Sequence, residues 1–276
     1  MTLLGRLSLR TTAITAVILV VGFFILVPFY FVVLGSLKSP AEAAELKLTL
    51  PSVWKWDNYS YIIQDVSIVR YFGNSLLISV TGTVFIVFAA SMAAFVLGRR
   101  QQKFALAVYY IFVAGLIAPP QIIPTIKIMQ GLGLYNTFGG LVLFYSAIVF
   151  PFCVFLITGF IKGVPRELDE SSWMDGCSPV RLFVSIILPL LAPVAATAAI
   201  FAFMTIWNDF QWPFFLLTET SKWTLPLSVF KYVSQYGTKW HYVFAILMLV
   251  MLPVIIAFVF AQKYIIAGMT AGAIKG

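Results

Sequence analysis

Six apolar stretches separated by polar segments set the pattern of this chain. A helix that crosses a bilayer needs about 20 consecutive apolar residues, and six stretches approach or exceed that length. Proline interrupts several of them, which membrane helices tolerate where neighbouring groups bond the freed carbonyls. The pattern predicts an all-α polytopic membrane protein, a single domain over residues 1–276. Its six transmembrane helices are expected at 12–35, 70–97, 104–126, 138–160, 183–209 and 241–262.

Two of these stretches depart from a simple spanning helix. In 104–126, the prolines 119, 120 and 124 and the following Lys127 predict a broken helix that ends near a membrane interface. The first stretch follows Arg6 and Arg10, as in a signal peptide. Its apolar run is longer than the roughly 7–15 residues of a signal core. We therefore interpret it as a retained first span.

Composition supports a membrane environment. Hydrophobic residues make up 61% of the chain and charged residues 10%, with a mean hydropathy of +0.99, whereas soluble domains carry roughly 25% charged residues. The net charge of +8 could suggest nucleic acid as a partner. The basic residues are scattered between apolar runs, however, so anionic membrane lipid explains them better. Cys153 in an apolar run and Cys177 in a polar loop are expected at different depths, without a disulfide.

The short loops predict the orientation. Residues 98–103 place Arg99, Arg100 and Lys103 within six positions, whereas the long segment 36–69 spreads its basic residues thinly. Because short loops rich in Lys and Arg stay in the cytoplasm, both termini are predicted to be cytoplasmic. The polar loop at 163–182 then lies on the same side.

This polar loop, with the stretch that follows it, has the local signals of two short helices around a glycine. Pro165 suits a first helical turn, and Gly176 can take the left-handed conformation that ends a helix. Ser178–Pro179 forms an N-cap and N1 pair for a second helix, which Pro189 ends or kinks. On these rules alone the segment is a capped helix in a solvated loop. Its small, mostly polar face, which a partner could approach closely, carries Leu168, Ser171, Ser172 and Asp175.

The order of residues in the loop resembles the signature of the permeases of ATP-binding-cassette (ABC) importers, the EAA motif. Glu170–Ser171–Ser172 precedes Asp175–Gly176, and Ile187–Leu188–Pro189 follows, as Glu-Ala-Ala, Asp-Gly and Ile-x-Leu-Pro do in that family. Serines replace the two alanines, and Cys177 replaces the usual alanine after the glycine. The resemblance implies a cytoplasmic coupling helix that fits a cleft on an ATPase subunit. The ATPase-coupling residues it implies are Glu170, Ser171, Ser172, Asp175, Gly176 and Cys177.

Further segments, from Ser36 to the last residue, resemble the carbohydrate branch of these permeases and, at Trp207–Asn208 and the C-terminus, the smaller maltose-type second permease. The resemblance implies a multi-pass subunit of a bacterial or archaeal cytoplasmic (inner) membrane. It implies as partners a second permease subunit, two ATPase subunits that bind ATP and Mg, and an extracytoplasmic solute-binding protein. It also implies a tail, Ile274, Lys275 and Gly276, that contacts the ATPases. The segments are 36–38, Pro51, Trp54, 58–59, 74–76, 131–137, 207–208 and 268–276.

Candidate residues for a solute path are Trp207 and Asn208. An indole face suits the apolar face of a sugar ring, and an amide both donates to and accepts from hydroxyl groups. A pair that packs helices together is an equal alternative. Tyr145 and Gln121 are polar groups in or near the third and fourth stretches that could also line a path, although bonding between helices is the simpler role.

Other classes of function find little support. The chain has no glycine-rich phosphate loop, no metal-ligand cluster and no Cys-His or Gly-x-Ser-x-Gly pattern, so we expect neither an enzyme nor a bound cofactor or metal. The predicted spans lack the midplane ionisable residues typical of ion-coupled carriers. The preferred prediction is the permease subunit of a sugar or oligosaccharide importer. An importer of glycerol-phosphate or another polar solute, or a self-sufficient secondary carrier, remain as alternatives.

Overall fold

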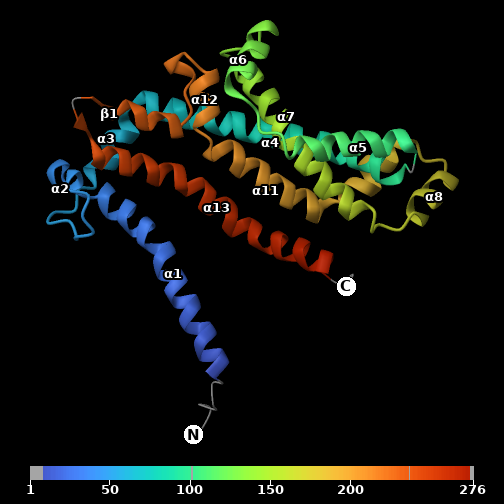
Figure 1. Cartoon of the computed structure of the whole chain (residues 1–276), viewed down its shortest axis with the longest axis horizontal. Helices are drawn as coiled ribbons and strands as arrows, with labels where there is room; N and C mark the ends of the chain where they lie inside the picture. Colours follow the sequence, from blue (N-terminus) through green and yellow to red (C-terminus); the bar gives the residue numbers. More distant parts are fainter. Residues whose placement is uncertain (1–8, 101, 236, 274–276) are drawn as a thin grey trace. The chain divides into compact units, whose positions relative to one another are not determined.

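The computed structural model describes residues 9–100, 102–235 and 237–273 (Figure 1). In this part of the chain, four helices are long and apolar enough to cross a membrane by length and composition. They coincide closely with the apolar stretches predicted at 12–35, 70–97, 138–160 and 241–262. These helices are α1 (Leu9–Ser36), α4 (Val66–Arg99), α7 (Phe138–Ile161) and α13 (Trp240–Ala273).

The stretch predicted at 183–209 is a broken helix rather than a straight one. Residues Pro179–Leu190 are bent by 78° from α11 (Ala192–Asn208), and the pair counts as a fifth candidate span. Pro189 has no N–H to donate to the carbonyl four residues earlier, and proline rings disturb the preceding turn. The turn before it is accordingly a π-helix, and the predicted kink lies at Leu191. The first arm consists of α9 (Pro179–Leu182), the π-helix η1 (Phe183–Ile187) and α10 (Leu188–Leu190).

The stretch predicted at 104–126 is also interrupted. It forms α5 (Lys103–Gly115) and α6 (Ile122–Gly131), with Pro119–Pro120 between them. With 13 residues, α5 is about 20 Å long, shorter than the roughly 30 Å hydrocarbon core. The predicted break is confirmed. The described residues therefore do not establish a count of six spans.

The chain forms two compact units, and the boundary between them passes within α4 and α13. The first unit comprises residues 1–68 and 228–249, and the second comprises 69–227 and 250–276. The first unit includes α1, α2 (Pro40–Ala44), α3 (Asp57–Gln64) and an antiparallel ribbon of β1 (Val233–Ser234) with β2 (Gly237–Thr238). The single domain expected over 1–276 stays a prediction.

In the first unit, the segment after α1 is held by two polar side chains buried in its fold. Lys38 is 2% exposed and donates to the carbonyl of Lys47 at 2.6 Å. The Asn58 amide donates to the carbonyls of Ser36 and Lys38 at 2.8 and 3.0 Å. Because buried donors are costly unless bonded, these contacts give residues 36–58 a defined shape. Resemblance to known permeases had singled out the same residues.

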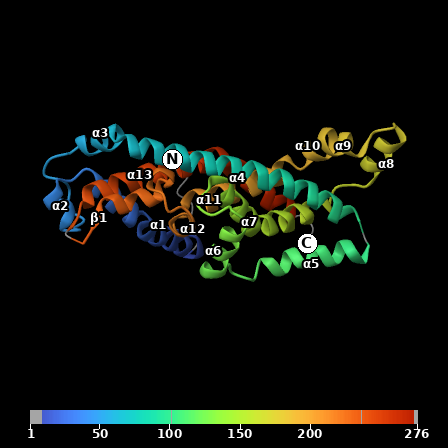
Figure 2. The same cartoon turned by 90° about the horizontal axis from the view of Figure 1, so that it is seen from above.

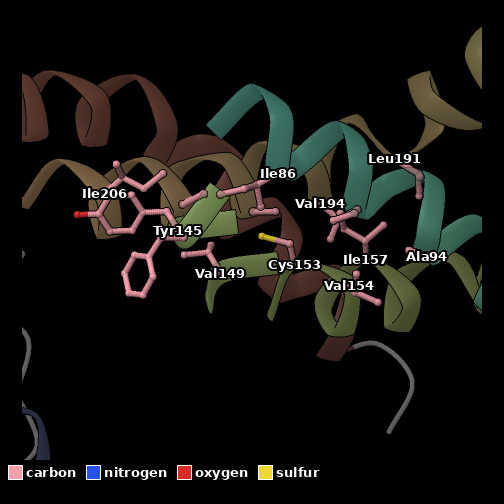
Figure 3. Packing of buried hydrophobic residues seen from close by; sticks show 14 of the residues in the cluster. Ile86, Ala94, Tyr145, Val149, Cys153, Val154, Ile157, Leu191, Val194 and Ile206 are labelled. Carbon is pink, nitrogen blue, oxygen red and sulfur yellow. The ribbon is translucent and has the colours of Figure 1, made fainter. Parts of the chain in front are cut away.

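In the second unit, the core lies along α7, which packs against both α5 and α11 (Figures 1 and 2). Cys153 is fully buried, and Figure 3 shows it among Ile86, Val149 and Val154. The cysteines Cys153 and Cys177 are both free, as predicted.

At one end of this core, α4 and α7 approach each other closely. A Cβ added at Gly98 would lie 2.3 Å from the Cγ2 of Ile161. That distance is far inside van der Waals contact, so the backbone of α4 can approach α7 only because residue 98 has no side chain.

At the other end of α7, polar side chains organise the segment from α12 (Gln211–Leu216) to Leu225. Asn136 (φ +59°) accepts from the N–H groups of Thr218 and Glu219, and Lys222 donates to its carbonyl at 2.9 Å. The Asn74 amide donates to the carbonyls of Ser221 and Trp223, and the N–H of Leu225 donates to Ser75 at 2.7 Å. These bonds define the course of two short 3₁₀ turns, η2 (Thr220–Lys222) and the start of η3 (Pro226–Lys231).

Candidate functional site: the α8 loop

The loop helix α8 (Glu167–Met174) ends as the sequence predicts. Gly176 has φ +73°, in the left-handed region that glycine alone adopts without strain. Its N–H donates to the carbonyl of Trp173 at 3.0 Å, and the N–H of Cys177 donates to that of Ser172 at 3.0 Å. These two bonds form a Schellman motif, which satisfies carbonyls at the end of the helix. The predicted left-handed conformation of Gly176 at the end of the helix is confirmed.

The helix that follows also starts as predicted. Ser178 accepts a hydrogen bond from the N–H of Arg181, and Pro179 occupies the first turn of α9. The first turn of α8 carries Glu167, Asp169 and Glu170, whose negative charges complement the positive end of the helix dipole. The two short helices thus enclose a glycine corner of fixed geometry.

The small polar face predicted for α8 is exposed at Leu168, Ser171 and Asp175 but not at Ser172. Ser172 is only 7% exposed, and its hydroxyl donates to the carbonyl of Leu168 at 2.6 Å, so it faces its own chain. Glu170, Ser171 and Asp175 are exposed. Trp173 and Met174 are 66% and 89% exposed. The exposed surface of α8 therefore combines large apolar side chains with carboxylates, whereas Ser172 is buried against its own chain.

Arg99, the last residue of α4, holds the start of α8. Its Nε lies 2.6 Å from Oδ2 of Asp169, and one terminal nitrogen donates to Oδ1 at 3.1 Å. Further bonds run to the carbonyls of Val164 at 2.8 Å and Pro165 at 3.3 Å. The two charged side chains are 12% and 16% exposed. A shielded ion pair reinforced by a charge-assisted hydrogen bond fixes orientation, so these contacts hold the start of α8 against the end of α4.

Sequence reasoning did not identify Arg99 as part of the loop, although one signal was available. Arginines at the end of an apolar stretch and a nearby loop with surplus carboxylates are natural partners. In both views of the second unit, α8 lies at the end where α4 stops and α5 starts (Figures 1 and 2). The separation of 70 positions between Arg99 and Asp169 conceals this proximity in the sequence.

The candidate path residues divide into two buried and two exposed. Trp207 is 1% exposed, donates from Nε1 to the carbonyl of Val250 at 2.9 Å and packs against Phe203. Tyr145 is 2% exposed, and its hydroxyl donates to Asp209 at 2.8 Å. Both side chains bond helix to helix. The geometry therefore favours a packing role for Trp207 and Tyr145.

Asn208 and Gln121 are exposed, and the structure does not bring them together with the two buried residues into one site. Gln121 precedes α6 and donates to the carbonyl of Pro119 at 3.4 Å. The tail residues Ile274, Lys275 and Gly276 lie outside the described residues. Among the residues described, no group of three or more His, Cys, Asp or Glu side chains could hold a metal ion.

A second charged contact lies in the first unit, outside the spans. Asp65 accepts from Lys231 and from the Ser67 hydroxyl, the latter at 2.6 Å. Burial by itself would raise the pKa of the Asp65 carboxyl, but these hydrogen bonds outweigh it and lower that pKa to about 2. The contact joins the start of α4 to the segment that leads into β1.

Residues 72–271 match the family described as "Binding-protein-dependent transport system inner membrane component". The matched region contains α8, Arg99 and the core along α7. The chain belongs to this family.

Its curated relatives are permeases. It is 35% identical to "Probable starch degradation products transport system permease protein AmyC" of Thermoanaerobacterium thermosulfurigenes, over 90% of this chain and 91% of the relative. It is 31% identical to the "Melibiose/raffinose/stachyose import permease protein MelC" of Bacillus subtilis, over 98% of both chains. It is also 31% identical to the "Diacetylchitobiose uptake system permease protein NgcG" of Streptomyces coelicolor, over 96% of this chain and 90% of the relative.

A solved structure shows the same fold. The likeness is to a chain of a bacterial ABC transporter involved in the import of the acidic polysaccharide alginate, with a TM-score of 0.81 and 21% identity, covering 95% of this chain and 99% of that chain. Family and relatives together make this protein a membrane-spanning permease subunit of an ABC importer, a transport component rather than an enzyme. The predicted family is confirmed.

Proposed function

We propose that this permease subunit carries a sugar or an oligosaccharide across the membrane. The observation that carries the proposal is the range of solutes in the names of its relatives. Similar identities connect the chain to permeases named for starch products, melibiose, arabinooligosaccharides and diacetylchitobiose. Because these relatives are named for different saccharides, they support carbohydrate as the class of solute without selecting an individual sugar.

The solute can be tested by uptake in proteoliposomes that contain the complete transporter and its binding protein. Labelled maltodextrins, melibiose and arabinooligosaccharides are offered in turn, with glycerol-phosphate as the competing class. We expect ATP-dependent uptake of at least one saccharide. Uptake of glycerol-phosphate alone would favour the alternative importer, and uptake driven by an ion gradient without ATP would favour a secondary carrier.

For coupling, we propose that α8 is the helix that fits a cleft on the ATPase subunit. The Schellman corner at Gly176 and the Arg99 contacts hold it rigidly, while Trp173 and Met174 supply an exposed apolar centre. Exposed aromatic and methionine side chains are typical of interface cores. Glu170 and Asp175 would meet basic or backbone donors at the margin, and Ser171 and Cys177 would allow close approach. Ser172 would support the helix from behind.

For assembly, we propose a six-helix subunit in the bacterial or archaeal cytoplasmic membrane with both termini inside. The density of basic residues at 98–103 supports this orientation. Its partners would be a second permease, two ATPases that carry ATP and Mg, and an extracytoplasmic binding protein. The related alginate transporter has been solved with such a periplasmic protein. The tail 274–276 would contact the ATPases.

The coupling proposal is tested by a double-mutant cycle on Arg99 and Asp169. Arg99→Gln leaves a largely buried carboxylate unpaired, which typically costs about 3 kcal/mol or more. We expect transport and solute-stimulated ATP hydrolysis to fall together in Arg99→Gln and Asp169→Asn, with the double variant no worse than either single one. Arg181→Gln is the control, an exposed arginine in the same loop. Normal stimulation in both single variants would contradict a coupling role for α8.

A further inference from the structure

Beside the α8 loop, the second unit has a cavity with an unusual concentration of positive charge. Its volume is about 450 Å³. It lies where α4 ends at Arg99, α5 begins at Lys103 and α7 ends at Ile161, which is one end of the membrane-crossing helices. We call it the basic cavity, and its lining includes Arg99, Arg100, Lys162, Arg166, Tyr109 and Thr158.

Three of the four cations in the basic cavity have no acidic partner. Arg99 is paired with Asp169, but Arg100, Lys162 and Arg166 take part in no ion pair within the described residues. The lining itself contains no acidic residue. Lys162 lies over the ring of Tyr109, with Nζ 5.2 Å from the ring centre. Several cations that line one cavity without a carboxylate among them favour an anionic ligand there.

A buried hydroxyl also lacks a partner at this place. Thr158 lines the basic cavity and is 1% exposed, and its Oγ1 has no hydrogen bond among the described residues. Threonine in a helix commonly bonds a carbonyl of the preceding turn, as Thr205 does in α11. A buried polar group without a partner is costly. The Thr158 hydroxyl is therefore available to an oxygen of a ligand.

An apolar groove of about 420 Å³ adjoins the basic cavity. It lies between α4 and α5, and Leu97 and Arg100 line both spaces. Most of its wall is hydrocarbon or aromatic, from residues such as Val96, Phe104, Val108 and Phe112. A polar, cationic space that continues into an apolar channel at the end of a membrane helix matches an amphiphile with an anionic head.

We propose that the basic cavity and the apolar groove together bind an anionic phospholipid. The phosphate of the headgroup lies among Arg100, Lys162 and Arg166, and an acyl chain follows the groove past Val108. A lipid, rather than a free phosphate or an acidic protein surface, is favoured because the groove requires a hydrocarbon tail. Basic pockets between transmembrane helices bind anionic headgroups in this way.

The test uses the complete transporter in lipid nanodiscs of phosphatidylcholine with a minor fraction of phosphatidylglycerol. After transfer to detergent, native mass spectrometry counts the phosphatidylglycerol that stays bound. Each basic residue near an anionic headgroup strengthens binding about fivefold. The triple variant Arg100→Gln, Lys162→Gln, Arg166→Gln should therefore lose retention on the order of 100-fold. Arg70→Gln, at the other end of α4, is the matched control and should retain the lipid.

Two variants keep the charges and test the remaining features. Val108→Trp fills the groove and should lower retention, whereas Thr158→Val removes only the hydroxyl and should lower it several-fold. If the triple variant does not assemble into a transporter, phosphatidylglycerol retention by the single variants Lys162→Gln and Val108→Trp tests the proposal instead. Unchanged retention in the charge variants overturns the site. If Val108→Trp does not lower retention, and soluble glycerophosphoglycerol displaces the bound phosphatidylglycerol, the proposed lipid site is wrong. The basic cavity would then bind an anion without an acyl chain.

Discussion

Gly176 is the residue whose backbone conformation decides the shape of the α8 loop. With φ +73° and no atom within 4 Å of an added Cβ, the cost of a side chain there is conformational rather than steric. Gly176→Val should cost about 1–2 kcal/mol of local stability and misplace α8. We expect solute-stimulated ATP hydrolysis to collapse while membrane insertion stays normal.

A matched control for this prediction is Gly159→Val in α7. An added Cβ at Gly159 also meets nothing within 4 Å, but its φ lies outside the left-handed region. It should retain most of its activity. Full stimulation of ATP hydrolysis in purified Gly176→Val transporter would show that the corner geometry is not needed.

The lowered pKa of Asp65 predicts that the stability of the protein depends on pH in the acid range. Its carboxyl has a folded pKa of about 2, below the ordinary value of 3.8. The contact with Lys231 therefore contributes fully to the stability of the folded protein above about pH 4, and this contribution is lost as the pH falls through about 2. The melting temperature of Asp65→Asn should lie below that of the wild type near neutral pH, and the difference should shrink in acid.

The control for Asp65 is Glu45→Gln, which removes the partner of Lys47 in an ion pair with both side chains more than half exposed. Exposed pairs contribute at most about 1 kcal/mol, so its melting temperature should follow the wild type. A difference for Asp65→Asn that is constant from neutral to acid pH would assign the effect to something other than this titration.

The helix predicted to be ended or kinked by Pro189 bends by 78° at Leu191. Substituting Pro189 and Pro193 by alanine restores two N–H donors to the backbone and should straighten the helix. From a rise of 1.5 Å per residue, full straightening lengthens the distance between residues 180 and 205 by about 8 Å. Spin labels at these exposed positions, in a Cys177→Ser background, would measure it. Pro151→Ala in α7 is the control, and an unchanged distance in the double variant would show that packing imposes the bend.

The helices were predictable to different degrees, for physical reasons. The ends of α4 and α7 lie within a few residues of the predicted 70–97 and 138–160, because run length and flanking polar residues decide where such helices end. Gly176 was predictable because the left-handed corner favours one residue type. The ion pair between Arg99 and Asp169 and the burial of Ser172 were not predictable, because both depend on contacts between distant segments.

For the complete chain, the structure distinguishes the two neighbouring candidates for the solute path by burial, and their variants should differ accordingly. Trp207 is buried, so Trp207→Ala should destabilise the transporter by about 3–5 kcal/mol. Asn208 is exposed, and Asn208→Ala should lower solute uptake without changing the melting temperature or binding-protein-stimulated ATP hydrolysis. Wild-type uptake by Asn208→Ala would mean that the partner permease supplies the contacts with the solute. The neighbouring Thr205→Ala, also exposed on α11, is the control.

The close approach of Gly98 to Ile161 has a consequence for how this chain can evolve. Even one methyl group at residue 98 would overlap the Cγ2 atom of Ile161 unless residue 161 becomes smaller. Substitutions at the two positions are therefore not independent: a lineage must shorten residue 161 before, or together with, gaining a side chain at 98. Among descendants that keep this packing of α4 on α7, the two positions should covary, with bulk at one matched by its loss at the other.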